Sequence, residues 1–253
     1  MESKQNHDSR LNIPGSSIVI TGGSTGIGRA TAILLAQNGA NLVIAGQGED
    51  HLNDAYNDIK QASSGGSIDY VNVDLATEQG IKDLFTTADE KLGRIDVFIN
   101  NAAIAFQGVS DGDYSDWERV VKTNLLGYIA CTRYALERMK SNKSGHIVNI
   151  GSMSADVREQ GSSVYVATKA GIQGFAESLR KEVNQDGIKV TLIEPGATGT
   201  DMQPASVEEQ QQNIQQMEMM KAEDVAEAVL YAISQPNRCD VVDLKLRPHL
   251  HLI

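Results

Sequence analysis

Residues 17–28 of the chain run Ser17-Ile18-Val19-Ile20-Thr21-Gly22-Gly23-Ser24-Thr25-Gly26-Ile27-Gly28. The apolar, β-branched residues 17–20 predict a buried strand, and residues 29–38 predict a helix closed by a glycine. In such a loop Gly22 allows a tight turn, Gly26 lets the backbone approach a pyrophosphate, and Gly28 lets the helix start close to the sheet. A plain turn is the alternative, but the place between strand and helix favours a dinucleotide site at the helix N-terminus.

The alternation of strands and helices continues along the chain. Further strands are predicted at 41–45, 68–73, 95–99, 146–150, 189–193 and 241–246, and further helices at 50–61, 78–92, 114–141, 165–184 and 221–234. Seven strands alternating with helices predict an α/β fold: a Rossmann-type, doubly wound, parallel seven-stranded sheet with helices on both faces. We expect a polar tail at 1–14 and one NAD(P)-binding domain at 15–253, in which residues 200–220 form a mobile substrate loop.

Composition limits the function classes. The chain has 253 residues, 41% hydrophobic and 22% charged, with a net charge of −11, which disfavours nucleic acid and anionic membranes as partners. Its start has no apolar core typical of a signal peptide, and no apolar run is long enough to span a bilayer. Cys131 and Cys239 lack metal-ligand spacing, so we expect no metal site. Two reduced, buried thiols fit a cytoplasmic protein.

Tyr165 and Lys169 lie four residues apart in a stretch with helical composition, so they share one helix face. A tyrosine titrates near ~10 and is a poor base at neutral pH. A nearby ammonium stabilises the phenolate and lowers the pKa of the tyrosine, which would make the pair an acid/base device. On its own the pattern favours a core tyrosine beside a solvated lysine, because this spacing occurs often by chance.

The polar clusters of the sequence follow the predicted strands at their carboxyl ends. Ligands of doubly wound sheets bind beyond these ends, so the clusters should converge on one site. They are the glycine loop 22–28, Asp74, Asn100, Ser152 and the loop 195–200. Asn100 and Asn101 predict a tight crossing in which side-chain amides bond to backbone, and Asp74 would accept a hydrogen bond from an adenine amino group or cap the next helix.

Taken together, these motifs resemble the short-chain dehydrogenase/reductase family from about residue 15 to 247. The matching set is Thr21-Gly22-x-x-x-Gly26-Ile27-Gly28, Asp74-Leu75, Asn100-Asn101-Ala102, Asn124, Ser152, Tyr165-x-x-x-Lys169 and Pro195-Gly196. Each motif is weak singly, but their order and spacing are specific. The chain departs from the family at Ala103, where glycine is usual, and at Gly46-Gln47, which leaves the choice of cofactor open.

The resemblance implies a catalytic group of Asn124, Ser152, Tyr165 and Lys169. Tyr165 would exchange a proton with the substrate oxygen, and Lys169 would lower its pKa and bind the nicotinamide ribose. Ser152 would hydrogen-bond the developing oxyanion. Asn124 would hold a water for a proton relay, and Thr200 the nicotinamide carboxamide. The expected cofactor-binding residues are Gly22, Ser24, Thr25, Gly26, Ile27, Gly28, Gln47, Asp74, Leu75, Asn101, Ala102, Tyr165, Lys169, Pro195, Gly196, Thr198 and Thr200.

The end of the second predicted strand bears on the choice of cofactor. An acidic residue there would bind the ribose 2′-OH of NAD, and an arginine the 2′-phosphate of NADP. Gly46, Gln47 and Gly48 offer neither, although Gln47 could donate a hydrogen bond to a phosphate. A flexible turn is the alternative interpretation. The missing carboxylate favours NADP(H), with NAD(H) as the alternative.

The substrate is a small-molecule alcohol or ketone in the leading interpretation, and its identity is open. Ser154, Arg158 and Gln160 lie between Ser152 and Tyr165 and are candidate substrate contacts, although such an arginine is more often a solvated loop charge. His249 and His251 alternate with leucine near the C-terminus, which suggests a tail strand or a subunit contact rather than a metal site. The small-residue helices around Asn124 and Tyr165 and the family resemblance predict a homo-oligomer, a dimer or a tetramer.

Three functions compete. The first is an NAD(P)-dependent oxidoreductase that interconverts a secondary alcohol and a ketone by hydride transfer, with Tyr165 as acid/base. The second is an epimerase or dehydratase on the same scaffold, but the short stretch after the sixth strand leaves little room for a substrate domain. The third is a non-catalytic, cofactor-sensing protein, which usually lacks the tyrosine or the lysine.

Overall fold

A computed structural model describes residues 9–251. Its centre is a seven-stranded parallel sheet in the order β3-β2-β1-β4-β5-β6-β7. The strands are β1 Ser17–Thr21, β2 Asn41–Gly46, β3 Ile68–Asn72, β4 Val97–Asn100, β5 Gly145–Ile150, β6 Ile188–Pro195 and β7 Asp243–Leu246. The predicted doubly wound sheet is therefore confirmed.

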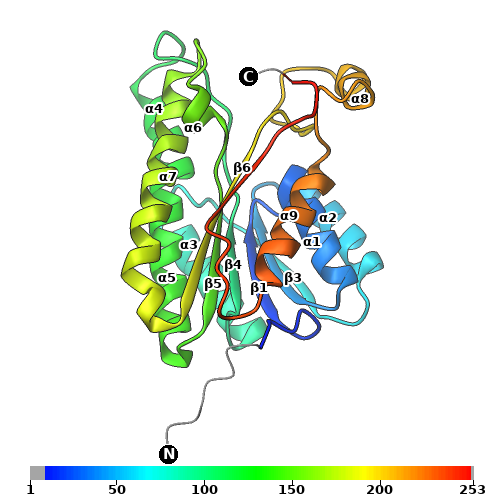
Figure 1. Ribbon diagram of the computed structural model, residues 1–253, viewed down its shortest axis with the longest axis vertical. Coiled ribbons are helices and arrows are strands. Elements are labelled where there is room, and N and C mark those ends of the chain that lie inside the picture. Colours follow the sequence, from blue (N-terminus) through cyan, green and yellow to red (C-terminus); the bar gives the residue numbers. More distant parts are fainter. Residues whose placement is uncertain (1–8, 252–253) are drawn as a thin grey trace, which may run out of the picture.

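Helices cover both faces of the sheet (Figure 1). One face carries α1 Gly26–Gln37, α2 Glu49–Ala62 and α9 Ala222–Ile233, and the other carries α3 Glu78–Leu92, α5 Gly127–Asn142 and α7 Ser163–Val183. The remaining helices are α4 Tyr114–Val121, the π-helix η1 Lys122–Leu126, the short α6 Ser154–Val157, the 3-10 turn η2 Asn184–Asp186 and α8 Val207–Gln215.

The strands bury apolar side chains on both faces. In β1, Ile18 and Ile20 join the core beneath α1 and α9, whereas Val19 joins the core beneath α3, α5 and α7. This alternation explains why the strands appear in the sequence as continuous apolar runs rather than as alternating patterns. Each large apolar side chain that is fully buried contributes roughly 1.5–3 kcal/mol to folding.

The order of the strands reverses between β1 and β4. The chain leaves these two strands toward opposite faces of the sheet, which opens a crevice between the loops that follow them. Thr21 Oγ1 accepts from the backbone N–H groups of Asn101 and Ala102, at 2.9 and 3.1 Å. The Asn101 amide donates to the carbonyl oxygens of Thr21 and Gly22, each at 3.0 Å. The expected bonding to backbone is confirmed for Asn101, and it fixes the two loops against each other, whereas the Asn100 amide donates to the side chains of Thr132 and Asn149 at 3.0 Å.

The predicted substrate loop at residues 200–220 includes a helix, because Ser206 and Glu209 form a capping box that starts α8. Two other expectations need correction. Thr77, not Asp74, caps α3. Cys239 is exposed, because it lies in the turn between α9 and β7.

The described part of the predicted polar tail, residues 9–14, contacts the rest of the fold: Ile13 is buried, and the Ser9 carbonyl accepts from Asn237 N–H at 2.8 Å. The rest of the predicted tail, residues 1–8, lies outside the described residues.

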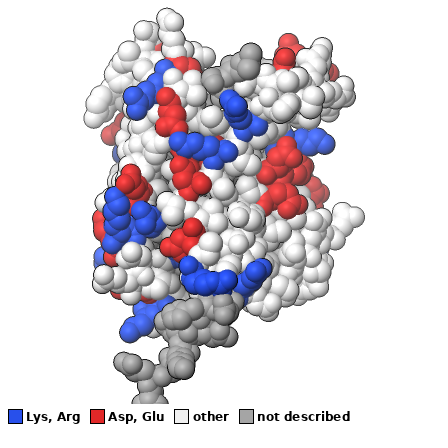
Figure 2. Space-filling view, viewed as in Figure 1, with Lys and Arg blue, Asp and Glu red and all other residues white. Residues whose placement is uncertain are grey.

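Charges of both signs share the surface. On the face seen in Figure 2, Lys and Arg side chains lie among Asp and Glu side chains rather than in one basic field. Within residues 9–251, no helix has the length and apolar content that crossing a bilayer requires. In the same range, no three His, Cys, Asp or Glu side chains are grouped so that they could hold a metal ion.

His146 makes the stability of the fold sensitive to acid. Burial lowers its pKa from 6.5 to about 3, and its ring lies 2.8 Å from Thr191 Oγ1. Between these two pH values the unfolded chain binds a proton on this ring and the folded chain does not, so stability falls as the pH is lowered through the window. We expect His146→Gln, which cannot titrate, to flatten the pH dependence of the urea midpoint between about pH 6 and 4.

Wild type is the control for this measurement, because the buried Glu194, whose pKa is raised to about 7, titrates in both proteins. An identical slope in the two proteins would show that the ring does not stay neutral in the folded state.

Candidate active site

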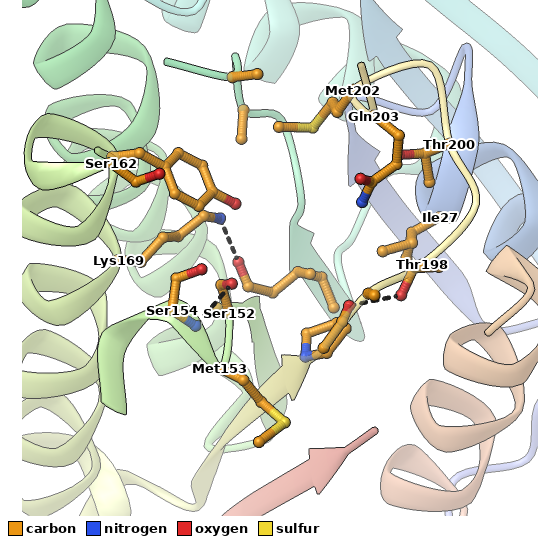
Figure 3. A pocket seen from close by; sticks show the side chains of 18 of the residues that line it. Ile27, Ser152, Met153, Ser154, Ser162, Lys169, Thr198, Thr200, Met202 and Gln203 are labelled. Carbon is orange, nitrogen blue, oxygen red and sulfur yellow. Dashed lines mark hydrogen bonds between the residues drawn. The ribbon is translucent and has the colours of Figure 1, made fainter. Parts of the chain in front are cut away.

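A cavity of about 540 Å³ opens at the carboxyl ends of β1, β4, β5 and β6. In Figure 3, Lys169, Ser152 and Ser154 lie on one side of it, and Thr198, Thr200 and Gln203 lie on the other. The sequence-predicted residues that line it are Ile27, Asn101, Ser152, Ser154, Tyr165, Lys169, Pro195, Gly196, Thr198 and Thr200. The chain thus brings residues from five separate motifs to one place.

Ser152 and Tyr165 meet in this cavity. Ser152 follows β5, and its hydroxyl accepts a hydrogen bond from Ser154 N–H at 3.1 Å, which fixes its position. Tyr165 lies in the first turn of α7, where a hydrogen bond with Ser152 lowers its pKa. Burial acts in the opposite direction with larger effect, and the net pKa of Tyr165 is raised. The predicted lowering by Lys169 is therefore not what governs this tyrosine here.

Lys169 lies one turn after Tyr165 and is buried. Its ammonium donates to the carbonyl oxygen of Ile150 at 3.1 Å, and it lies 5.7 Å from the centre of the Tyr165 ring and 5.6 Å from that of Tyr128. Burial lowers the pKa of Lys169 to about 8. The amine is consequently held at the base of the cavity and can change its protonation state in the physiological range.

Asn124 is fully buried in the π-helix η1, on the helix run that the sequence predicts as continuous. Its side-chain oxygen accepts from Ile104 N–H at 2.8 Å, and its amide donates to the Ile104 carbonyl at 2.9 Å. Both side-chain groups are therefore committed to one loop residue. A π turn breaks the regular helical hydrogen bonding and is frequent at functional sites, so the expected buried role of Asn124 has a structural basis.

The glycine loop fits a bound dinucleotide. Gly22 and Gly26 have φ values of 64° and 51°, in the left-handed region. A Cβ on Gly28 would lie 2.0 Å from the Gly22 carbonyl oxygen. Helix α1 has no acidic residue in its first turn, and no side chain caps its N-terminus. Its N–H groups and positive dipole end can therefore receive phosphates.

The end of the crevice beside β2 and β3 contains an arginine that sequence reasoning missed. Arg119 of α4 donates to Gln47 Oε1 at 3.2 Å and to Asp74 Oδ2 at 3.4 Å. Asp74 Oδ1 also accepts from Ala76 N–H at 3.0 Å. The nearest acid after β2, Glu49, is engaged by Tyr70 and by Asn72. The Arg119 guanidinium thus lies at the end of β2, where the local sequence, Gly46-Gln47-Gly48, has neither an acidic residue nor an arginine.

The predicted substrate contacts divide. Ser154 lines the cavity and donates to Glu159 at 2.7 Å. Arg158 and Gln160 are not lining residues, and the Arg158 guanidinium donates back to the Ala155 carbonyl at 3.2 Å. Sequence reasoning missed several lining residues that carry no motif: Ala103, Ala105, Phe106, Ile150, Gly151, Met153, Val157, Glu159, Ser162, Ala197, Met202, Gln203 and His251.

The remaining predicted residues, Gly22, Ser24, Thr25, Gly26, Gly28, Gln47, Asp74, Leu75, Ala102 and Asn124, lie outside the lining of this cavity. The glycine loop joins the cavity through Ile27, and Gln47 and Asp74 lie at the other end of the crevice, beside Arg119.

Comparison with known proteins points in one direction. The family model described as short chain dehydrogenase matches residues 16–212. An uncharacterized oxidoreductase of Staphylococcus aureus (strain N315) is 32% identical over 231 residues, which cover 91% of this chain and 96% of the relative. An uncharacterized oxidoreductase of Staphylococcus epidermidis is 30% identical over the same shares.

Solved structures agree with the sequence relatives. A short chain dehydrogenase from Burkholderia cenocepacia J2315 in complex with NADP superposes with a TM-score of 0.82 at 27% identity, covering 94% of this chain and 98% of its own. A metagenomic short-chain oxidoreductase in complex with NADP gives 0.81 at 26% identity, covering 94% and 99%.

Proposed function

The chain belongs to the short-chain dehydrogenase family, and we propose that it is an NADP(H)-dependent oxidoreductase that interconverts a secondary alcohol and a ketone, with Tyr165 as acid/base. The supporting observation is the meeting of Ser152, Tyr165 and Lys169 in one cavity beside the glycine loop. When bound, NADP(H) supplies the hydride in the reducing direction and accepts it in the oxidising one.

Tyr165 and Ser152 handle the substrate oxygen. In reduction, the Tyr165 hydroxyl gives its proton to the carbonyl oxygen, and Ser152 donates a hydrogen bond to that oxygen as negative charge develops. In oxidation, the phenolate takes the proton back. The effect of Ser152 on the pKa of Tyr165 supports this pairing, because it places the two side chains next to each other in the cavity that both line.

Lys169 and Asn124 support the proton transfer. Below about pH 8 the buried Lys169 is charged, and its ammonium would donate to the nicotinamide ribose, whereas the lowering effect on the pKa of Tyr165 comes from Ser152. Both polar groups of the Asn124 side chain bond to the Ile104 backbone. We therefore propose that the side chain holds η1 in shape, and that the main-chain carbonyl of Asn124 binds the relay water.

The remaining predicted residues would hold the cofactor. The α1 N-terminus would bind the pyrophosphate through the loop Gly22–Gly28, and Asp74, Leu75, Asn101 and Ala102 would border the adenosine half. Pro195, Gly196, Thr198 and Thr200 line the cavity on the nicotinamide side. Residues 200–220, with α8, would cover the bound substrate.

Arg119 supports a preference for NADP(H). A guanidinium beside the end of the second strand suits a 2′-phosphate, since arginine binds phosphate through paired N–H groups. The complexes of the two solved relatives with NADP agree with this preference. The Asp74 carboxylate partly neutralises the charge of Arg119. The N–H groups of Arg119 that do not face Asp74 could still donate to a phosphate.

We expect Arg119→Ala to raise the Kd for NADPH about tenfold, which corresponds to the ~1.4 kcal/mol of one charge-assisted hydrogen bond. The Kd for NADH should stay within about twofold of wild type. Fluorescence titration with both cofactors in parallel measures the two constants. Arg133→Ala, which removes a surface arginine paired with Glu137, is the matched control.

An equal change of both Kd values in Arg119→Ala would mean that Arg119 contacts the adenosine common to both cofactors. Tighter NADH binding by wild type would reverse the assignment to NADP(H). Binding of neither cofactor would remove the support for an oxidoreductase altogether.

The assembly is proposed to be a homo-oligomer, a dimer or a tetramer. The helix run α4–η1–α5 exposes Val121, Leu126 and Ile129 by 43%, 52% and 40% of their surface. Such apolar side chains suit a contact with a second subunit. The free thiols, Cys131 and Cys239, suit a cytoplasmic location.

A further inference from the structure

The C-terminal segment after β7 returns to the mouth of the catalytic cavity. In Figure 1 the red segment runs from the sheet to the side of α8. Two backbone hydrogen bonds hold it: Gly196 N–H donates to Leu246 O at 2.7 Å, and Leu250 N–H donates to Met217 O at 2.9 Å. Pro248 is buried between these points. The segment is therefore fixed to the loops that line the nicotinamide side of the cavity.

This anchoring carries His251 into the cavity lining. Its Nδ1 atom is buried and has no hydrogen-bond partner among the described residues. A buried polar nitrogen without a partner loses its hydrogen bonds to water and gains none in return, so a native fold keeps one mainly where a ligand or water completes it. His249, two residues earlier on the same segment, is exposed.

The other lining residues limit what the ring can meet. Among the described residues that line the cavity, Lys169 is the only lysine or arginine, and its ammonium donates to the Ile150 carbonyl oxygen. The carboxylate of Glu159 also lines it, which disfavours an anionic substrate. Phe106, Val157 and Met202 provide apolar walls. The cavity therefore fits an uncharged molecule with an apolar body and few polar groups.

We propose that His251 binds the substrate: its Nδ1 forms a hydrogen bond with a hydroxyl group on an uncharged, otherwise apolar ketone whose carbonyl meets Tyr165 and Ser152. The inference rests on the proposed oxidoreductase function. It makes His251 a specificity-determining residue, supplied by the C-terminal segment rather than by any of the family motifs. A hydroxyl suits either tautomer of the ring, because it both donates and accepts.

The test compares matched ketones with NADPH as reductant. One series carries a terminal hydroxyl group at several chain lengths, for example octan-2-one hydroxylated at its far end, and its partner series has a methyl group in that place, for example nonan-2-one. Each pair has the same number of heavy atoms. We expect wild type to prefer the hydroxyketone at the chain length that reaches His251.

His251→Ala should raise the KM of that hydroxyketone about tenfold and leave the KM of the plain ketone and the Kd of NADPH within about twofold. His251→Gln, whose amide can still bond, should recover part of the loss, and His249→Ala should change nothing. An equal effect of His251→Ala on both ketones, an effect on NADPH binding, or no effect would overturn the proposal. Failure of wild type to reduce any ketone would instead refute the oxidoreductase function itself.

Discussion

Replacement of Tyr165 by phenylalanine should lower kcat by about three orders of magnitude while the protein still folds and binds NADPH. The substitution removes one hydroxyl, which is the proposed proton donor, and a positioned acid/base group is worth about 10²–10⁴-fold. The lost hydrogen bond joins Tyr165 to Ser152 only, so the fold should keep its stability within about 1 kcal/mol.

The measurements are the rate of NADPH oxidation with a ketone and the NADPH Kd by fluorescence. Tyr231→Phe is the matched control, because Tyr231 lies on α9 and is 56% exposed. Its kcat should equal that of wild type. A Tyr165→Phe enzyme that keeps its kcat within tenfold of wild type would refute the role of the tyrosine as acid/base.

Replacement of Gly28 by alanine should raise the NADPH Kd at least a hundredfold and lower the melting temperature. The new Cβ would lie 2.0 Å from the Gly22 carbonyl oxygen and 2.5 Å from Asn101 Nδ2. These atoms are hydrogen-bonded to each other at 3.0 Å and are backbone or tightly held, so α1 must move away from the loop. Overpacking of this kind typically lowers the free energy of unfolding by about 1–3 kcal/mol. The displacement of α1 would also move its N-terminus away from the position of the pyrophosphate and so weaken NADPH binding.

Gly174→Ala is the control for this substitution. Gly174 lies within α7, where an added Cβ would meet nothing within 4 Å, and alanine favours a helix over glycine by about 0.5–1 kcal/mol. Its melting temperature should stay the same or rise. If Gly28→Ala matched Gly174→Ala in both melting temperature and cofactor affinity, the close packing of α1 on the loop would be wrong.

The elements that the sequence predicted well are those with a strong local signal. The bounds of α3, residues 78–92, agree fully with the prediction, because Thr77 caps one end and Gly93 ends the other in the left-handed region. The strands were evident because parallel strands buried on both faces are continuous apolar runs. The convergence of the motifs on one crevice followed from the rule that ligands bind beyond the carboxyl ends of such strands.

The missed features depend on contacts between residues far apart in the sequence. Arg119 and Gln47 are separated by 72 positions, and only the folded chain brings the Arg119 side chain to Gln47, which follows β2, and to Asp74, which follows β3. His251 likewise reaches the cavity only because β7 and the following segment return along β6. The start of α8, in contrast, had a local signal that was overlooked: the capping box of Ser206 and Glu209.

The pKa of Tyr165 shows a different limit of sequence reasoning. Four-residue spacing predicts that Lys169 and Tyr165 share a helix face, but it says nothing about the burial that raises the pKa of the tyrosine or about the Ile150 carbonyl that takes up the ammonium. Desolvation is a property of the folded cavity, and it decides the direction of both shifts.

The transfer of deuterium from NADPH to a ketone tests the proposed function most directly. The cofactor is labelled at the transferring carbon of its nicotinamide, in both epimeric forms, and the alcohol products of a broad ketone panel are examined by mass spectrometry. An oxidoreductase with the site built by Ser152, Tyr165 and Lys169 should place one deuterium on the carbinol carbon from one epimer only. Tight NADPH binding with no label in any product would contradict catalysis and leave a protein that senses the cofactor.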